Sequence, residues 1–241
     1  MNVRAIIFDI YGTLLEVGPP PAEADTLWEL LWQDQVKCPA PSSLAQFSAA
    51  CDRIIAREHE AARARGIPHP EVFWPDVAGE ALPELGALPD SARDDFFFHQ
   101  AQLWHTVRLP TAATETLRTL GQSSLLLGIA SNAQPYTLRE LDEALAGSSL
   151  FRALFKPALC FWSFEHGFSK PDPHVFRLLT MRLRAFGIPP TETLMVGDRL
   201  DHDIEPARAQ GWQTWWLSPP ARANQGGGWA ELAQRLSSGL Q

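Results

Sequence analysis

Short apolar runs recur along the chain, and each has the length of a buried β-strand. Polar or turn-forming residues bound every run, which favours strands over segments of buried helix. A run that is apolar throughout, without alternation, is typical of a strand covered on both faces. We therefore predict five strands, at residues 3–8, 125–130, 159–162, 193–196 and 212–217.

Stretches with the spacing of amphipathic helices separate most of these runs. Strands that alternate with helices form a parallel sheet with helices on both faces, so the predicted class is an α/β fold. The ligand of such a sheet lies at the carboxyl ends of its strands. The helices predicted in this part of the chain cover residues 111–120, 136–146, 173–186 and 203–210, and a loop at 219–228 precedes a last helix at 229–236.

The chain between the first and second predicted strands has a different pattern. It follows Gly18 and three consecutive prolines, and it contains no convincing strand. Helical periodicity appears at residues 22–35, 42–65 and 91–107. A helical segment that interrupts an alternation of strands and helices is an insertion. We predict a core of residues 1–16 and 108–241 and an all-helical cap of residues 17–107.

The composition and the net charge of the chain exclude some classes of binding partner. Of the 241 residues, 45% are apolar, which is enough for a substantial core, and no apolar run is long enough to cross a bilayer. The formal charge is −8 and no basic stripe appears, so we expect no nucleic-acid partner. The N-terminus enters the first strand without a leader, so we expect a cytoplasmic protein with a small-molecule substrate and no membrane partner. Nothing in the sequence indicates an oligomeric state.

Carboxylates follow the first and fourth predicted strands. Asp9 comes directly after the first strand and before a turn at Gly12 and Thr13, which can hold a carboxylate exposed and aimed, as a nucleophile requires. An aspartate at such a place is also a common helix cap or turn residue. Asp198 and Asp203 lie in a tight turn after the fourth strand, and hard oxygen ligands at this density suit Mg²⁺.

Two further motifs carry hydrogen-bond donors. Ser131 and Asn132 follow the second strand and offer a hydroxyl and an amide, although most such pairs only cap a helix. Lys170 lies in the sequence Ser-Lys-Pro-Asp-Pro, just before a predicted helix. There its ammonium can join backbone N–H groups in holding an anion. For the lysine alone, a plain helix start is the simpler interpretation.

Taken together, the four motifs, in this order and each at a strand end, resemble the haloacid dehalogenase superfamily. The resemblance covers about residues 1–16 and 108–220, and the helical segment is similar in position to the type-1 cap of that superfamily. It implies a hydrolase with a Rossmann-like core, with Asp9 as the catalytic nucleophile and Mg²⁺ as the cofactor. Within the cap, no motif carries a role over.

The resemblance also implies a role for each motif residue. Four groups at the strand ends would ligate the metal: the second oxygen of Asp9, the backbone carbonyl of Tyr11, Asp198, and Asp203 directly or through water. Three side chains would bind the phosphoryl oxygens: Ser131, Asn132 and the catalytic Lys170. Two unit charges about 4 Å apart repel by roughly 4 kcal/mol at an effective dielectric of about 20, so the acidic groups should need a cation beyond one lysine.

One position departs from the phosphatases of this superfamily. They usually carry a second Asp two residues after the nucleophile as general acid, whereas this chain has Tyr11 there, a further candidate for contact with the substrate. Tyr at this position resembles the 2-haloacid dehalogenases, which expel halide and need no proton donor. Those enzymes typically have Ser and Asn where this chain has Asp198 and Leu200, and they work without a metal. Because Asp198 would repel a carboxylate substrate, we prefer the metal-dependent phosphatase.

Three functions therefore stay open. The leading hypothesis is a Mg²⁺-dependent phosphatase that acts on a small phosphorylated metabolite through an aspartyl-phosphate intermediate. The second is a 2-haloacid dehalogenase with an aspartyl-ester intermediate, and the third is a non-catalytic binding protein of the same fold. A phosphatase without the second Asp would need a good leaving group or an acid from the cap. Glu58, His59 and Glu60 are the candidates there, although a solvated helix face is the simpler interpretation of all three.

The other prominent side chains of the cap are expected to have structural roles. Tryptophans in amphipathic helices usually pack against other helices or the core, and we expect this for Trp28, Trp32, Trp74 and Trp104. A dehalogenase would use one cap arginine to bind the substrate carboxylate or halide. We expect a solvated helix face for the arginines of the second cap helix, which are Arg53, Arg57, Arg63 and Arg65.

Overall fold

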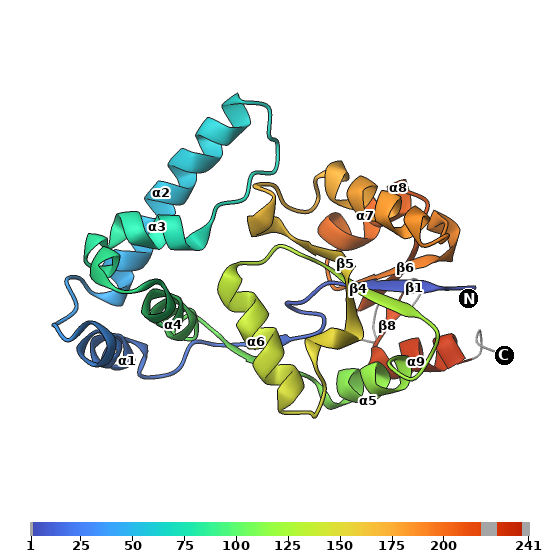
Figure 1. The fold of residues 1–241 in the computed structure, drawn as a ribbon, viewed down its shortest axis with the longest axis horizontal. Coiled ribbons are helices and arrows are strands. Elements are labelled where there is room, and N and C mark those ends of the chain that lie inside the picture. Colours follow the sequence, from blue (N-terminus) through green and yellow to red (C-terminus); the bar gives the residue numbers. More distant parts are fainter. Residues whose placement is uncertain (1, 218–225, 238–241) are drawn as a thin grey trace.

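The computed structural model describes residues 2–217 and 226–237, and a sheet and a group of helices lie side by side in it (Figure 1). Six parallel strands form the sheet, in the order β5-β4-β1-β6-β7-β8. This confirms the predicted α/β class with a parallel sheet. The strands are β1 (Ala5–Phe8), β4 (Leu126–Ser131), β5 (Phe155–Trp162), β6 (Thr193–Gly197), β7 (Gln213–Leu217) and β8 (Gly226–Gly227).

The central strand β1 sets the position of the predicted site residues. It is fully buried and pairs with β4 on one side and with β6 on the other. Its last residue, Phe8, lies beside Ile129 of β4 and Val196 of β6. The backbone N–H of Asp9 then donates to the carbonyl of Val196 at 3.0 Å. The parallel register therefore brings the residues that follow β1, β4 and β6 to the same edge of the sheet.

Helices cover both faces of the sheet (Figure 1), because successive side chains of a strand point to opposite faces. Ile6 and Phe8 of β1 pack with residues of α5, α6 and α9, whereas Ala5 and Ile7 pack with residues of α7 and α8. The predicted helices of the core are confirmed, although the segment 203–210 begins as a π-helical turn (Leu200–Ile204). The helices are α5 (Thr111–Leu120), α6 (Pro135–Ala146), α7 (Pro173–Ala185), α8 (Glu205–Ala209) and α9 (Trp229–Ser237).

We use the name cap for residues 17–107, the division proposed from the sequence. The segment is mainly helical, as predicted, and holds an aromatic core of its own. Trp28 stacks on Phe47 with ring centroids 5.1 Å apart, and Trp32 and Phe96 are buried against them. The predicted packing of the tryptophans is thereby confirmed. The elements are α1 (Ala24–Leu31), a π-helical turn (Trp32–Val36), α2 (Leu44–Ala64), α3 (Trp74–Ala81), a 3₁₀ helix (Pro83–Ala87) and α4 (Asp90–Ala101).

A two-stranded antiparallel ribbon joins the cap to the core, where the sequence indicated no strand. β2 (Glu16–Gly18) pairs with β3 (Thr106–Arg108), and an ion pair between Glu16 and Arg108 lies across the ribbon. The predicted helix at 91–107 is therefore wrong beyond Ala101, where α4 ends. Strands of three residues are too short to show an alternating pattern, and each pairs with a segment far away in the sequence.

Two other segments differ from the prediction. β5 begins at Phe155, earlier than predicted. The prediction missed this start because the residues that follow Phe155 are exposed at the sheet edge and show no apolar run. Gly226 and Gly227 form β8 beside β7, inside the predicted loop. An added Cβ at Gly226 would overlap the carbonyl of Trp216, so glycine permits this close pairing. The part of that loop at 219–225 lies outside the described residues.

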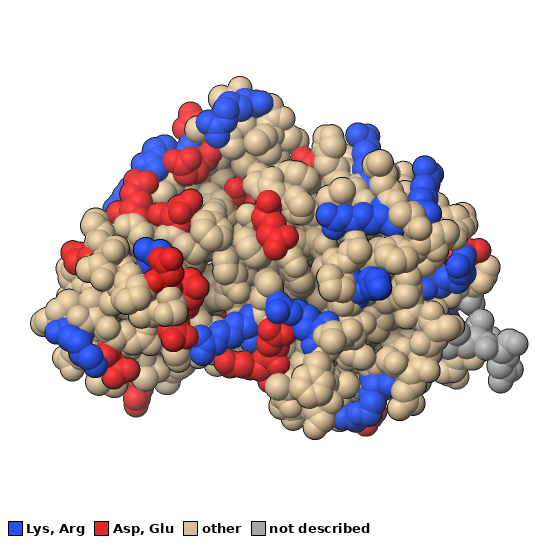
Figure 2. Space-filling view, viewed as in Figure 1, with Lys and Arg blue, Asp and Glu red and all other residues tan. Residues whose placement is uncertain are grey.

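On the face seen in Figure 2, Asp and Glu side chains are mixed with Lys and Arg over the cap, whereas Lys and Arg predominate on the half that carries the sheet, where they form no continuous stripe. Among the described residues, none of the helices combines the length and the apolar character that crossing a bilayer requires.

Candidate active site

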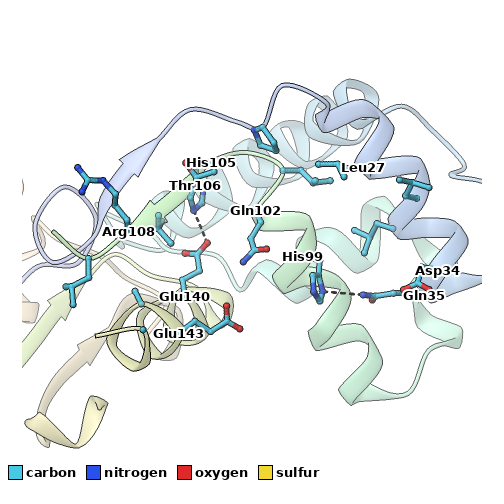
Figure 3. Close-up of a pocket in the computed structure, with 18 of the residues that line it drawn as sticks. Leu27, Asp34, Gln35, His99, Gln102, His105, Thr106, Arg108, Glu140 and Glu143 are labelled. Carbon is cyan, nitrogen blue, oxygen red and sulfur yellow. Dashed lines mark hydrogen bonds and ion pairs between the residues drawn. The ribbon is translucent and has the colours of Figure 1, made fainter. Parts of the chain in front are cut away.

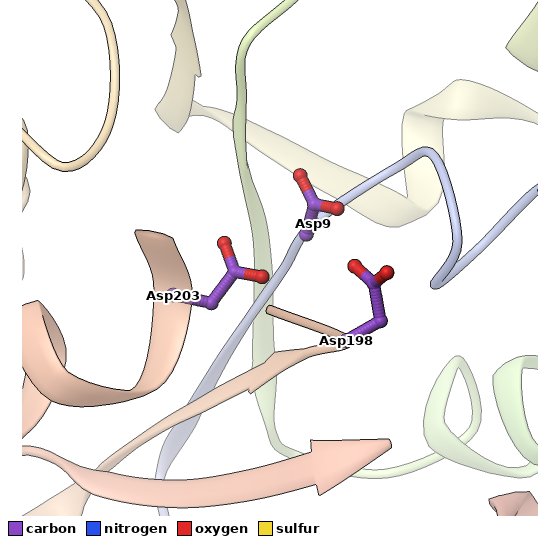
Figure 4. A group of neighbouring side chains, drawn as sticks. All are labelled: Asp9, Asp198 and Asp203. Atoms are coloured by element: carbon purple, nitrogen blue, oxygen red, sulfur yellow. The ribbon is translucent and has the colours of Figure 1, made fainter. Parts of the chain in front are cut away.

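Three aspartates meet at the carboxyl edge of the sheet. Asp9 follows β1, Asp198 follows β6, and Asp203 lies in the π-helical turn before α8 (Figure 4). One oxygen from each carboxylate lies within 4.8 Å of the others. Asp9 and Asp203 are buried, with 8% and 1% of their surface exposed, and Asp198 is half-buried. The structure therefore brings together three of the residues that the sequence put forward as metal ligands.

Two glycines make room for this cluster. The backbone of Gly12 has a φ of +78°, and a Cβ there would overlap the carboxylate of Asp198. Gly197 ends β6, and a Cβ at that position would overlap the carboxylate of Asp203. Any larger residue at either place would push a carboxylate out of the cluster. The close approach of backbone to carboxylate thus depends on glycine.

Lys170 lies among the carboxylates with only 3% of its surface exposed. Its Nζ donates to Oδ1 of Asp9 and to Oδ1 of Asp203, both at 2.6 Å. Asn132 holds the backbone of the lysine: its Oδ1 accepts from the Lys170 N–H at 2.8 Å, and its Nδ2 donates to the Lys170 carbonyl at 2.9 Å. The Asn132 amide, which we predicted to contact a phosphoryl group, is therefore used to position Lys170.

The cluster holds more negative than positive charge. Burial raises the pKa of Asp9 to about 7, with further increases from Asp203 and Asp198 and only partial opposition from Lys170. Burial and the charge of Asp203 also raise the pKa of Asp198. Burial lowers the pKa of Lys170, but Asp203 and Asp9 outweigh this effect, so the net direction is upward and the ammonium keeps its charge. Three carboxylates against one ammonium leave an acidic site.

The set of side chains in the cluster fits a divalent cation such as Mg²⁺. Carboxylate oxygens are the ligands that this hard cation prefers, and its charge would offset the repulsion that raises the pKa of Asp9. Asp9, Asp198 and Asp203 are the residues that would hold it. Below about pH 7, the cation would have to displace a proton from Asp9.

Replacement of Gly197 by Ala tests whether the cluster is the cation site. The added methyl group would displace the Asp203 carboxylate, so we expect Mg²⁺ affinity to fall by at least about tenfold in titration calorimetry. Gly86→Ala is the matched control, because an added Cβ there meets no atom within 4 Å and should leave affinity unchanged. Equal Mg²⁺ affinities for the two variants would contradict a cation site in the cluster.

Ser131 has a hydroxyl without a partner. It ends β4, its surface is 1% exposed, and its Oγ makes no hydrogen bond to any described residue. Leaving a buried hydroxyl unpaired costs about 1–3 kcal/mol. A ligand oxygen at the sheet edge would satisfy it. This is the observation in the structure that best fits the predicted contact of Ser131 with substrate.

Tyr11 points away from the cluster, toward α6. Its hydroxyl donates to Oε2 of Glu140 at 2.5 Å and lies 3.0 Å from Oγ1 of Thr137. The other oxygen of Glu140 lies 3.0 Å from Nε2 of His105, whose ring meets that of Tyr11 edge to face. Burial, then the charge of Glu140, raises the pKa of Tyr11 above its usual range. The phenol therefore keeps its proton.

Glu140 and His105 were not predicted from the sequence. Glu140 has 2% of its surface exposed and lies on the buried side of α6, beside Thr137 and Leu141. A charged residue at the apolar positions of an amphipathic helix is a signal that could have identified it. His105 lies in the segment that we predicted as helix and that instead leads into β3, so its neighbours could not be inferred.

The cap contacts the core beside the cluster through a loop at residues 69–73. Oε2 of Glu71 in this loop accepts from Oγ of Ser163, which follows β5, at 2.7 Å. Gln134, the residue before α6, accepts from the backbone N–H of Trp74 and donates to the carbonyl of Val72, both at 2.8 Å. Burial raises the pKa of Glu71, although its hydrogen bonds oppose the shift. Ser163 therefore takes part in the contact between the core and the cap.

The charged residues of α2 lie elsewhere. Arg57 forms ion pairs with Glu58 and Glu80 at the exposed surface. His59 lines a groove of about 460 Å³ between α2 and α3, together with Glu58 and Glu80. No residue of the acidic cluster lines that groove. The solvated face that we expected for Glu58 and Arg57 is confirmed.

A cavity between the cap and the core is also separate from the cluster. It has a volume of about 940 Å³ and lies between α1, the end of α4, β3 and α6 (Figure 3). Glu140 and His105 line it, and Tyr11 contacts both of them. None of the aspartates of the cluster, nor Lys170, lines the cavity. The cavity and the cluster are therefore separate features, which both contact the segment of Tyr11.

Comparisons with known proteins identify relatives of this chain. A family model described as haloacid dehalogenase-like hydrolase matches residues 3–211. A phosphoserine phosphatase of Thermus thermophilus is 34% identical over 147 residues, which make up 60% of this chain and 54% of that protein. The chain spans about half the length of the curated relatives that it matches.

Solved structures share the fold over nearly the whole chain. A 2-haloacid dehalogenase from Pseudomonas syringae pv. Tomato DC3000 matches with a TM-score of 0.58 at 20% identity, over 98% of this chain and 99% of that one. A haloacid dehalogenase-like phosphatase from Thermococcus onnurineus matches with a TM-score of 0.55 at 20% identity, over 97% of this chain and 98% of that one. At this identity the likeness shows the fold alone, and it does not separate the two reactions.

Proposed function

This chain belongs to the haloacid dehalogenase-like hydrolase family, and we propose that it is a Mg²⁺-dependent phosphatase of a small phosphorylated metabolite. The observation that carries the proposal is the convergence of Asp9, Asp198 and Asp203, which offer one oxygen each within 4.8 Å of the others, a donor set that suits Mg²⁺ and that would repel any anionic substrate without a metal. The Thermus relative, named a phosphoserine phosphatase, supports the same class of reaction.

The reaction proceeds through a covalent intermediate on Asp9. One oxygen of its carboxylate attacks phosphorus, the bond to the leaving group breaks, and water then cleaves the aspartyl-phosphate. Lys170 and the unpaired hydroxyl of Ser131 bind the phosphoryl oxygens. When bound, Mg²⁺ supplies the positive charge that the phosphoryl group and the carboxylates require. The cap covers the edge of the sheet, which keeps bulk water from the intermediate.

Tyr11 favours a second candidate, the hydrolytic dehalogenation of a 2-halo acid, because its place after Asp9 resembles those enzymes. Two observations speak against it. The acidic cluster would repel the carboxylate of such a substrate. Arg57, one of the arginines considered as a halide or carboxylate ligand, is in an exposed ion pair with Glu58 and Glu80.

The proposal is tested with p-nitrophenyl phosphate in the presence of Mg²⁺ or EDTA, and with 2-chloropropionate and halide detection. We expect phosphate release that depends on Mg²⁺ and no halide release. Asp198→Asn should lower Mg²⁺ affinity by at least about tenfold in titration calorimetry. The matched control is Asp201→Asn in the same turn, because Asp201 is exposed and paired with Arg199, outside the cluster.

Three results would contradict the proposal. Halide release that EDTA does not inhibit would establish the dehalogenase instead. Phosphate release that is unaffected by EDTA would remove the role of the cation. No turnover of either substrate, with Asp9→Asn indistinguishable from the parent in ligand binding, would favour a binding protein that performs no catalysis.

A further inference from the structure

The donors around Asp9 determine which leaving groups can depart. When the bond from phosphorus to the leaving oxygen breaks, that oxygen receives the electron pair. An alkoxide needs a proton at that moment, and a positioned acid contributes about 10²–10⁴-fold. A carboxylate leaving group does not, because carboxylates are stable anions at neutral pH, with pKa values of about 4. A site without a free acid therefore selects activated phosphates.

The hydroxyl nearest to the nucleophile in the sequence is unavailable as an acid. The O–H of Tyr11 donates to Glu140 at 2.5 Å, and Thr137 lies 3.0 Å from the same oxygen. Glu140 is buried, and His105 contacts its second oxygen at 3.0 Å. A hydrogen bond to a buried carboxylate is strong, and it directs the proton toward α6, away from Asp9.

The other donors near the cluster are committed or too weak. Lys170 donates to Asp9 and Asp203, and an ammonium held between two carboxylates is a poor proton donor even while its third N–H binds a phosphoryl oxygen. Ser131 has a free hydroxyl, but an aliphatic hydroxyl is no stronger an acid than the alcohol that it would have to protonate. The cap loop offers Glu71, whose carboxylate accepts from Ser163 and from the backbone N–H of Val72. None of these described donors is therefore an acid aimed at a leaving group.

We propose, on the basis of the phosphatase function above, that the substrate is an acyl phosphate or a comparably activated phosphate, and not the phosphate ester of an alkyl alcohol. Asp9 forms a bond to phosphorus while the phosphorus–oxygen bond to the acyl group breaks, and the electron pair leaves on the carboxylate. Water then attacks the phosphorus of the aspartyl-phosphate. The products are inorganic phosphate and the regenerated Asp9 carboxylate, and one proton of the water passes to solvent.

The test compares acetyl phosphate with ethyl phosphate, which differ in the carbonyl group and are close in size. With the Mg²⁺-loaded parent, kcat/KM for acetyl phosphate should exceed that for ethyl phosphate by at least about 10²-fold, the lower end of what a general acid contributes. Across a series of aryl phosphates, log kcat/KM should fall steeply as the pKa of the leaving phenol rises. Equal values for acetyl and ethyl phosphate, or a flat aryl series, would overturn the inference.

Two variants at position 11 sharpen the test. Tyr11→Asp places a carboxylic acid beside the nucleophile, so the ratio of the two kcat/KM values should fall by about 10²-fold. Tyr11→Phe retains the ring and removes the hydroxyl, and the ratio should stay as in the parent. If Tyr11→Phe lowers the turnover of ethyl phosphate selectively, the tyrosine is the acid and the inference is wrong. If the parent hydrolyses neither these compounds nor p-nitrophenyl phosphate, the proposed function fails first.

Discussion

Replacement of Asp9 by Asn is expected to lower kcat/KM for p-nitrophenyl phosphate by at least about 10³-fold, because an amide cannot form the covalent bond to phosphorus. The side chain lies at the buried edge of the sheet, and Asn matches it in size, so the fold should persist. Steady-state kinetics give the loss. Mass spectrometry of rapidly quenched protein should detect phosphate on the peptide that contains Asp9 in the parent, and none in the variant.

Asp201→Asn provides the comparison for this experiment. It also exchanges a carboxylate for an amide, but at a side chain that is 62% exposed and paired with Arg199. Its kcat/KM should stay within about twofold of the parent, because exposed ion pairs contribute little. An Asp9→Asn variant with the turnover of Asp201→Asn would mean that another group attacks phosphorus, or that water attacks it directly.

Replacement of Lys170 by Met is expected to destabilise the metal-free protein by about 3–5 kcal/mol, because removing one partner leaves buried carboxylates without compensation. The ammonium is 2.6 Å from Asp9 and 2.6 Å from Asp203, and all three groups are buried. Urea unfolding followed by circular dichroism measures the change. Saturating Mg²⁺ should restore part of the loss, since the cation replaces charge at the same carboxylates.

Lys37→Met is the matched control for this prediction. Lys37 is 76% exposed and pairs loosely with Asp34 at 3.9 Å. The free energy of unfolding of this variant should lie within about 0.5 kcal/mol of the parent value, as for most surface changes. If Lys170→Met and Lys37→Met prove equally stable without Mg²⁺, the buried charges of the cluster are compensated by something other than the lysine.

The reactive edge of the sheet could be predicted because each of its residues directly follows an apolar run. Phe8 precedes Asp9, and the glycine at the end of β6 precedes Asp198, so a prediction of the strands already placed their carboxylates. Parallel strands have their carboxyl ends at one edge, and this brought residues from distant parts of the chain together. Local pattern and global topology agree at this edge.

The remaining contacts of the site could not be predicted, since they join segments that share no local pattern. The destination of the Tyr11 hydroxyl depends on Glu140 of α6 and on His105 at the end of the cap. Glu71 meets Ser163 only because the cap folds back over the sheet. The ribbon of β2 and β3 likewise exists only once both ends of the cap lie side by side. The periodicity of apolar residues predicts single helices and strands, but it does not predict which distant segments contact each other.

Gln134 lies two residues after Asn132, and the two side-chain amides form hydrogen bonds to different parts of the molecule. Asn132 bonds to the backbone of Lys170, and Gln134 bonds to the backbone of the cap at Trp74 and Val72. The same short stretch of chain after β4 therefore holds both the Lys170 backbone and the cap in position. A movement of the cap away from the core would break the hydrogen bonds of Gln134 to Trp74 and Val72. We expect a movement of the cap and the position of the Lys170 ammonium to affect each other through these three consecutive residues.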